Sequence, residues 1–127
     1  MTQVKRRVLV VDDEADVGLT LKFMLEPYGF EVDCFTDPVK ALENFKSDMY
    51  NLIILDIRMP KINGFELYSK FKSIDAKTKT IFLTALTDLD DYVDQKNEVY
   101  PKIRERHYAQ KPVTDRELLQ HVYSITN

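Results

Sequence analysis

The sequence alternates short apolar runs with longer amphipathic segments, and this alternation constrains the fold more than any other feature. Residues 8–11 and 52–55 contain no polar side chain, as expected of parallel strands that helices cover on both faces. Between these runs, apolar residues recur at helical spacing, for example Val17, Leu21 and Met24. Strands that alternate with helices predict an α/β fold with a parallel sheet, right-handed crossovers and helices on both faces.

The turn and capping residues divide the chain into five strand–helix units. Pro27 and Gly29 mark the end of the first helix, whose apolar stripe is expected to reach Tyr28. Helix starts are predicted at Asp37 with Pro38 and at the capping box that begins at Thr114. The expected strands cover residues 8–11, 31–36, 52–55, 80–83 and 107–110. A further polar helix is expected at about residues 88–98.

Length and composition indicate one ordinary globular domain covering residues 1–127. Hydrophobic residues make up 44% and charged residues 31%, with a formal net charge of −3. A nucleic-acid-binding protein is usually clearly basic, and a membrane span needs about 20 apolar residues in a row, so neither class is expected. The basic start is not followed by the apolar stretch of a secretory signal. Cys34 is the single cysteine and is expected to be a half-buried strand residue of a cytoplasmic protein.

Polar side chains follow the predicted strands at the points where these strands end. Asp12 and Asp13 follow the first strand, Asp56 the third, Thr84 the fourth and Lys111 the fifth. In an open parallel sheet the active crevice lies outside the carboxyl ends of the strands, so these residues are expected to converge. Clustered carboxylates repel one another unless a cation neutralises them. Mg²⁺ suits this role because it takes oxygen ligands and needs only one or two carboxylates.

The predicted cluster has the groups that phosphoryl transfer to a carboxylate requires. Asp56 is the best nucleophile candidate, because aspartate can accept a phosphoryl group as an acyl phosphate. Lys111 would place a positive charge on a phosphate oxygen, and Thr84 would offer a hydroxyl donor. This chemistry depends mainly on positioning and charge neutralisation.

Four sequence motifs, taken in order within the strand–helix frame, resemble the receiver domain of two-component response regulators, and of chemotaxis regulators in particular. They cover nearly the whole chain and read Val10-Val11-Asp12-Asp13-Glu14, Leu55-Asp56-Ile57-Arg58-Met59-Pro60 with Gly64, Leu83-Thr84-Ala85, and Lys111-Pro112. The resemblance implies a flavodoxin-like (βα)5 fold, a doubly wound parallel sheet with strand order 2-1-3-4-5. It also implies that a sensor histidine kinase, or a phosphotransfer protein, passes a phosphoryl group from a phosphohistidine to Asp56.

The same resemblance implies a magnesium site built from carboxylates and one backbone group. Asp13 would bind Mg²⁺ directly, Asp12 through water, and Asp56 as the acceptor carboxylate. The backbone carbonyl of Arg58 would complete the protein ligands, and Mn²⁺ can take the place of Mg²⁺. Thr84 and Lys111 would hold the phosphoryl oxygens.

The resemblance further implies a conformational switch made by Thr84 and Tyr108. Phosphorylation adds charge and acceptor oxygens, which draw the Thr84 hydroxyl inward. Tyr108 would then rotate inward and repack the surface around the fourth helix and the fifth strand. The repacked surface could also form a homodimer through the fourth helix, the fifth strand and the last helix.

The chain departs from the family pattern between Thr84 and Lys111. This segment is longer than expected by more than one helical turn, and the small Gly-Ala pair before the fifth strand is absent. We expect residues 88–106, between the fourth helix and the fifth strand, to form an extended loop or a lengthened helix with a specialised docking surface. The resemblance implies that the side chains of Arg58 and Leu86 occupy positions that tune hydrolysis of the acyl phosphate, and these two residues predict slow self-dephosphorylation.

Two other classes of function are compatible with parts of the sequence. The alternative is a phosphorylation-independent interaction module that keeps these residues and signals by constitutive docking. A flavodoxin-like cofactor binder or an aspartate-nucleophile phosphatase is disfavoured, because the first loop lacks a glycine run and residues 56–58 lack a second carboxylate. The leading prediction is a self-phosphorylating switch rather than a metabolic enzyme. It would act on a downstream protein or on a fused output domain absent from this chain.

Overall fold

The central sheet has the predicted topology. A computed structural model of the chain describes residues 6–84, 108–111 and 114–126. The sheet is parallel and its strand order is β2-β1-β3-β4-β5, which confirms the flavodoxin-like order expected from the sequence. The strands are β1 (Arg6–Val11), β2 (Phe30–Phe35), β3 (Leu52–Asp56), β4 (Lys79–Thr84) and β5 (Tyr108–Gln110).

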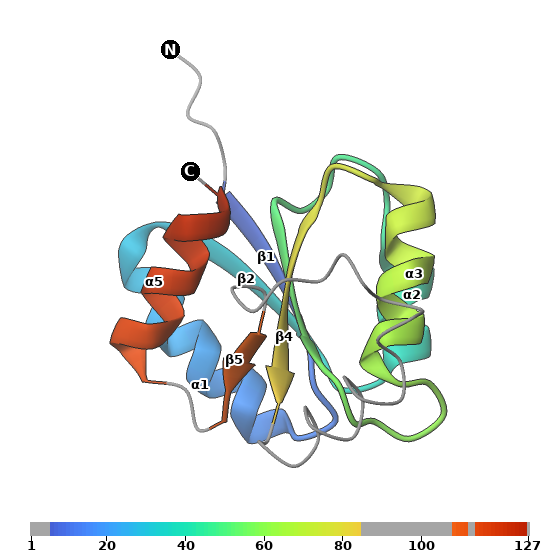
Figure 1. Ribbon diagram of the computed structural model, residues 1–127, viewed down its shortest axis with the longest axis horizontal. Coiled ribbons are helices and arrows are strands. Elements are labelled where there is room, and N and C mark those ends of the chain that lie inside the picture. The colour runs from blue at the N-terminus through green and yellow to red at the C-terminus, as the bar shows by residue number, and fades with distance from the viewer. Residues whose placement is uncertain (1–5, 85–107, 112–113, 127) are drawn as a thin grey trace.

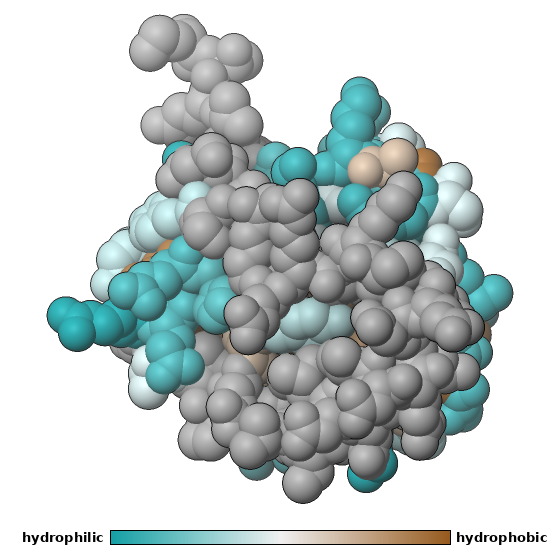
Figure 2. Space-filling view, viewed as in Figure 1, coloured by the Kyte–Doolittle hydropathy of each residue, from teal (hydrophilic) through white to brown (hydrophobic). Residues whose placement is uncertain are grey.

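Helices cover both faces of the sheet. In Figure 1, α1 and α5 lie on one side of the strands and α2 and α3 on the other. The helices are α1 (Ala15–Leu25), the short 3-10 helix η1 (Glu26–Tyr28), α2 (Pro38–Asn44), α3 (Gly64–Ile74) and α5 (Asp115–Thr126). The part of the surface that α5 forms is mainly hydrophilic (Figure 2). The helix expected at residues 88–98, the long segment 88–106 and Leu86 lie outside the described residues.

The core consists of two apolar clusters, one on each face of the sheet. Val8 and Val10 belong to the cluster beneath α1 and α5, whereas Leu9 and Val11 belong to the cluster beneath α2 and α3. Successive strand residues point to opposite faces, so a strand covered on both sides must be apolar at every position. Each fully buried aliphatic side chain contributes about 1.5–3 kcal/mol to folding, which accounts for the uninterrupted apolar runs.

Side-chain caps begin the helices where the sequence predicts them. The Asp37 carboxylate accepts a hydrogen bond from the backbone N–H of Val39 at the start of α2. The Thr114 hydroxyl oxygen accepts one from the N–H of Glu117 at 3.2 Å, which is half of the expected capping box. Each such cap stabilises a helix by about 1 kcal/mol.

Two sequence-based expectations on the α1 side are wrong. Tyr28 was expected in the buried stripe of the first helix but is 50% exposed. The helix tightens into η1 after Leu25, and the shorter period of a 3-10 turn moves Tyr28 off the buried face. Cys34 lies in a strand as expected, but its side chain is exposed, because β2 is an edge strand. Its thiol donates to the carbonyl of Gly18 at 3.2 Å.

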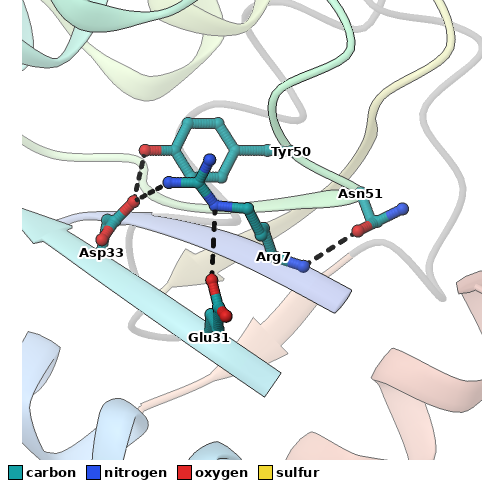
Figure 3. A network of polar contacts seen from close by, with 5 residues as sticks. All are labelled: Arg7, Glu31, Asp33, Tyr50 and Asn51. Carbon is teal, nitrogen blue, oxygen red and sulfur yellow. Dashed lines mark hydrogen bonds and ion pairs between the residues drawn. The ribbon is translucent and has the colours of Figure 1, made fainter. Parts of the chain in front are cut away.

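A polar network joins three chain segments near the amino ends of the strands (Figure 3). The Arg7 guanidinium donates to Asp33 at 2.9 Å, and the Tyr50 hydroxyl donates to the same carboxylate at 2.7 Å. Arg7 also lies 3.8 Å from the Glu31 carboxylate, and its backbone N–H donates to the Asn51 side chain at 2.9 Å. The network therefore ties the edge strand β2 to β1 and to the loop before β3.

A buried carboxylate joins the two loops at the amino end of the sheet. Asp75 is 6% exposed. Its carboxylate accepts hydrogen bonds from the backbone N–H groups of Asp48, at 2.9 Å, and Lys77, at 3.0 Å. These bonds hold the pKa of Asp75 below its usual value, although burial alone would raise it.

Asp75→Asn should lower the free energy of unfolding by about 1–3 kcal/mol at pH 7, because an amide has only one acceptor oxygen and leaves one of the two partly buried N–H groups without its acceptor. A lowered pKa stabilises the fold above the unfolded pKa of about 3.9, and this contribution is lost as the pH falls through the lower folded value. The difference between the two proteins should therefore narrow below about pH 4. Urea unfolding at several pH values measures it. Glu43→Gln, at an exposed position of α2, is the control, and a pH-independent difference would contradict the charge-based account.

Candidate functional site

The predicted carboxylates meet at the carboxyl edge of the sheet. Asp56 is the last residue of β3, and Asp12 directly follows β1, whose Val11 pairs with Leu55. Carboxylate oxygens of Asp12, Asp13 and Asp56 all lie within 4.8 Å of one another. Asp12 and Asp56 are buried, whereas Asp13 is exposed. The parallel register of neighbouring strands is therefore what brings residues 12 and 56 together.

Lys111 supplies the positive charge of the site. It follows β5, and its Nζ lies 3.0 Å from Asp12 Oδ2 and 3.2 Å from Asp56 Oδ1. Its side chain is 22% exposed, so one ammonium group bridges two buried carboxylates and still reaches the surface. Charge-assisted contacts of this kind are about twice as strong as neutral hydrogen bonds.

Burial and the neighbouring Asp12 carboxylate shift Asp56, the proposed acceptor, toward its protonated form. Burial, followed by the charge of Asp12, raises the pKa of Asp56 to about 7, although Lys111 opposes this shift. Burial alone would lower the pKa of Lys111, but its contacts with Asp12 and Asp56 outweigh burial and raise it. Two buried carboxylates and one ammonium leave the site with excess negative charge, which a bound cation would neutralise.

Local hydrogen bonds orient the Asp12 carboxylate. Its Oδ1 accepts from the backbone N–H of Glu14 at 2.9 Å, and its own N–H donates to the carbonyl of Phe35. Its Oδ2 is buried and lies 3.0 Å from Lys111 Nζ. An oriented carboxylate oxygen with remaining acceptor capacity is a suitable ligand for a hard cation.

Gly64 sets the backbone of the loop that follows Asp56. The N–H of Gly64 donates to the carbonyl of Ile57 at 2.8 Å, so the start of α3 packs directly on the end of β3. A Cβ atom at position 64 would collide with the backbone carbonyl oxygen of Asp56 and would lie 2.9 Å from Ile57 Cα. The sequence motif included Gly64, but sequence reasoning missed this close approach, which appears only when β3 and α3 are placed in space.

Three of the four remaining predicted site residues fall in the part of the chain that the structure describes. Arg58 is exposed and lies two positions after Asp56. Thr84 is the last residue of β4 and pairs in register with Gln110. Tyr108 begins β5 and is half-buried. Leu86 lies outside the described residues.

A cavity beside Lys111 has no counterpart in the sequence-based predictions. It has a volume of about 410 Å³ and is lined by Glu14, by four residues of α1, and by Leu83 and Lys111. Such a cavity requires α1 to lie against the ends of β4 and β5, so no local sequence pattern predicts it. It gives the Lys111 side chain an opening on the α1 side of the sheet.

Fold and site together define a doubly wound α/β protein with an acidic cluster and a bridging lysine at the carboxyl edge of its sheet. The sequence matches the response regulator receiver domain family over residues 8–123. The chain therefore belongs to the response regulator receiver domain family, and it is homologous to response regulators of two-component systems.

The relatives include a probable transcriptional regulator, ycf27, of Porphyridium aerugineum, which is 31% identical over 121 residues. That alignment covers 95% of this chain and 48% of the relative. The transcriptional regulatory protein RprY of Bacteroides fragilis is 29% identical, with 95% of this chain and 49% of the relative covered. The chain thus spans about half the length of the curated relatives it matches.

Solved structures show the same fold. A response regulator receiver domain protein from Clostridium thermocellum matches with a TM-score of 0.75 and 29% identity, covering 94% of this chain and 92% of that one. The non-phosphorylated HemR receiver domain from Leptospira biflexa matches with a TM-score of 0.76 and 26% identity, covering 94% and 93%. Among the helices that the structure describes, none combines the length and apolarity needed to cross a bilayer.

Proposed function

We propose that this receiver domain is a phosphorylation-activated switch that accepts a phosphoryl group onto Asp56. The observation that carries the proposal is the position of the Asp56 carboxylate. Lys111 Nζ lies 3.2 Å from Asp56 Oδ1, and the oxygens of Asp12 and Asp13 lie within 4.8 Å. Membership of the family supports the same assignment.

The residues present fit a divalent cation. The carboxylates of Asp12, Asp13 and Asp56, with the backbone carbonyl of Arg58, would hold Mg²⁺, and Mn²⁺ can take its place. The fit rests on the cluster of oxygens and on the buried Asp12 Oδ2, which pairs with Lys111 Nζ at 3.0 Å and keeps acceptor capacity for a cation. When bound, the ion would neutralise negative charge on the carboxylates and on the phosphoryl oxygens.

Phosphoryl transfer would proceed by attack of an Asp56 carboxylate oxygen on phosphorus. A new oxygen–phosphorus bond forms while the bond from phosphorus to the donor nitrogen breaks, and the leaving imidazole keeps that electron pair. Lys111 lies close enough to Asp56 to donate to a phosphoryl oxygen. We propose the same role for the Thr84 hydroxyl. Lys111 also keeps Asp56 more ionised, and therefore more nucleophilic, than burial alone would allow.

The proposed partners follow from the two-component family. The donor would be a sensor histidine kinase or a phosphotransfer protein in the cytoplasm, and the output would be a downstream protein or a further domain. We also propose that residues 88–106 form a docking surface and that Thr84 and Tyr108 form the switch. A homodimer would use the face made by the fourth helix, β5 and α5. Slow self-dephosphorylation, tuned by Arg58 and Leu86, also stays a prediction.

Incubation with Mg²⁺ and acetyl phosphate, followed by intact mass measurement, tests the proposal. The unaltered chain should gain one phosphoryl group, whereas Asp56→Asn should gain none, because an amide is not a nucleophile for phosphorus. Asp48→Asn, at an exposed loop position, is the matched control and should be phosphorylated normally. Chelation of the metal should stop uptake. Equal uptake by Asp56→Asn would contradict the acceptor assignment, and no uptake by any form would favour the phosphorylation-independent module.

A further inference from the structure

Four aromatic rings from α3, β4 and β5 form a continuous cluster. Phe82 of β4 lies at its centre, with its ring centroid 5.5 Å from that of Tyr108 and 5.4 Å from that of Tyr68. Phe65 lies 5.0 Å from Phe82 and 6.5 Å from Tyr108. These distances lie within the range of attractive ring packing. The cluster therefore connects the start of β5 with helix α3, directly through Phe65 and, for Tyr68, through the strand residue Phe82.

The Tyr108 ring is seated inside this cluster. Tyr108 is half-buried and packs against the apolar core on the α2 and α3 side of the sheet. Burial, followed by a smaller second effect from Tyr68, raises the pKa of Tyr108 to about 12. The second effect requires the two tyrosines to be close enough to interact, although Phe82 provides the direct ring contact with each. The inward position of Tyr108 is thus stabilised by rings that do not belong to the acidic site.

Tyr68 also contacts the side chain of Lys72. The ammonium of Lys72 lies 5.7 Å from the centroid of the Tyr68 ring. The same ammonium donates to the carbonyls of Ala76, at 3.1 Å, and Thr78, at 2.6 Å. Lys72 is therefore anchored to the loop between α3 and β4. Tyr68 therefore contacts an anchored cation and the ring of Phe82, which is 1% exposed.

We propose that Tyr68 is a positioning residue for Tyr108, which it holds inward through the ring of Phe82. The inference rests on the proposed function, in which Tyr108 is the mobile switch residue. Loss of an aromatic pair such as Tyr68–Phe82 changes an equilibrium by up to about 12-fold, and Tyr108 would respond to this loss through the ring of Phe82. The inward preference of Tyr108 is then set partly by helix α3. Phosphorylation would act on an equilibrium that the aromatic cluster already biases.

Fluorine NMR of the full chain labelled with 3-fluorotyrosine tests this inference. The chain has 7 tyrosines and no tryptophan, and loss of one signal in Tyr108→Phe assigns the Tyr108 resonance. In metal-free Tyr68→Ala the Tyr108 signal should move toward its solvent-exposed value, with the ratio of inward to outward forms reduced about 3-fold or more. Tyr68→Phe keeps the aromatic ring, so its Tyr108 signal should match that of the wild type. Tyr123→Ala, at a partly exposed position of α5, is the matched control.

Further variants distinguish a positioning role of Tyr68 from a general loss of stability. Tyr68→Leu keeps much of the side-chain volume, so it replaces Tyr68→Ala if that variant does not fold, and it should show the same loss of inward Tyr108. Adding Mg²⁺ and beryllofluoride, a mimic of the phosphoryl group, should return the Tyr108 signal of the variant toward the inward value. An unchanged Tyr108 signal in folded Tyr68→Ala and Tyr68→Leu, or an equal change in Tyr123→Ala, would overturn the inference.

The experiment also separates this inference from the proposed function. The metal-free comparison of Tyr68 variants uses no phosphoryl group, so it reports on the aromatic contact alone. If beryllofluoride changes no signal and acetyl phosphate does not modify Asp56, the proposed function fails while the metal-free result still stands. If Asp56 is phosphorylated normally and the Tyr68 variants leave Tyr108 unmoved, the positioning role alone fails.

Discussion

Replacement of Lys111 by methionine should reduce phosphoryl uptake at Asp56 by about 100-fold or more at neutral pH, because it removes a preorganised positive charge from the acceptor. Methionine has a similar length, so the change removes charge rather than volume. The ammonium is 3.0 Å from Asp12 and 3.2 Å from Asp56, and it lowers the pKa of Asp56. Without it, more of the acceptor carboxylate would be protonated and unreactive. Intact mass after timed incubation with acetyl phosphate and Mg²⁺ gives the rate.

The same variant should be less stable when metal is chelated, by about 3 kcal/mol above pH 8, because two buried carboxylates lose their shared counterion. The pH dependence has a defined sign. In the native state the pKa of Asp56 is raised to about 7. The folded state therefore holds the proton more tightly than the unfolded state, and stability falls as the pH rises from about 4 to about 7. Loss of Lys111 raises this pKa further, so the difference between variant and wild type should widen with rising pH.

Urea unfolding in the presence of chelator at pH 5 and pH 8 measures this difference. Lys77→Met, at an exposed loop position, is the matched control and should change neither stability nor phosphoryl uptake appreciably. If Lys111→Met were equally destabilised at both pH values, the loss would come from packing rather than from the carboxylate charges. Uptake at the wild-type rate would remove Lys111 from the proposed chemistry.

Gly64→Ala should destabilise the fold by about 2–3 kcal/mol, because the added methyl group overpacks a site where backbone must move to make room. The atoms in its path are the Asp56 carbonyl oxygen and Ile57 Cα. Both belong to the chain segment that carries the acceptor and leads to the proposed Arg58 ligand. The variant should therefore also lower phosphoryl uptake, even in the fraction that is fully folded.

Gly18→Ala in α1 is an informative comparison, because its Cβ would meet side-chain atoms of Cys34 at 3.2 Å instead of backbone. An exposed edge-strand side chain can shift, and alanine favours a helix by about 1 kcal/mol over glycine. We expect Gly18→Ala to stay within about 1 kcal/mol of wild type and to be phosphorylated normally. Urea unfolding and intact mass compare the two variants. If the two variants had the same free energy of unfolding and the same phosphoryl uptake, the backbone at position 64 would accommodate the added methyl group without loss of stability.

The strands of this fold were predictable because both faces of the sheet are covered. A strand such as β3 must be apolar at every position, and the pattern of residues 52–55 is visible without any tertiary information. Helix starts at Asp37 and Thr114 were predictable for a similar reason, since their caps act within one turn. Tyr28 was mispredicted because the change from α1 to the 3-10 turn η1 depends on how the helix end packs.

For the site, too, the sequence predicts which residues come together but not the distances between them. That Asp12, Asp56 and Lys111 share one edge follows from the order of strands and the direction of a parallel sheet, so the residue types and their places predict the cluster. The distances do not follow from this order. The bridging of two carboxylates by one ammonium and the raised pKa of Asp56 depend on burial, which the sequence does not display.

By itself, the sequence determined the α/β architecture, the family motifs and the set of polar residues at the strand ends, because these depend on local periodicity and on chain direction. Only the tertiary structure decided that Gly64 must lack a side chain, that a cavity opens beside Lys111, and that Tyr68 reaches Tyr108 through Phe82. Each of these relations joins residues from elements that are separate in sequence. Close packing and low-dielectric electrostatics act on distances in space, and folding creates those distances.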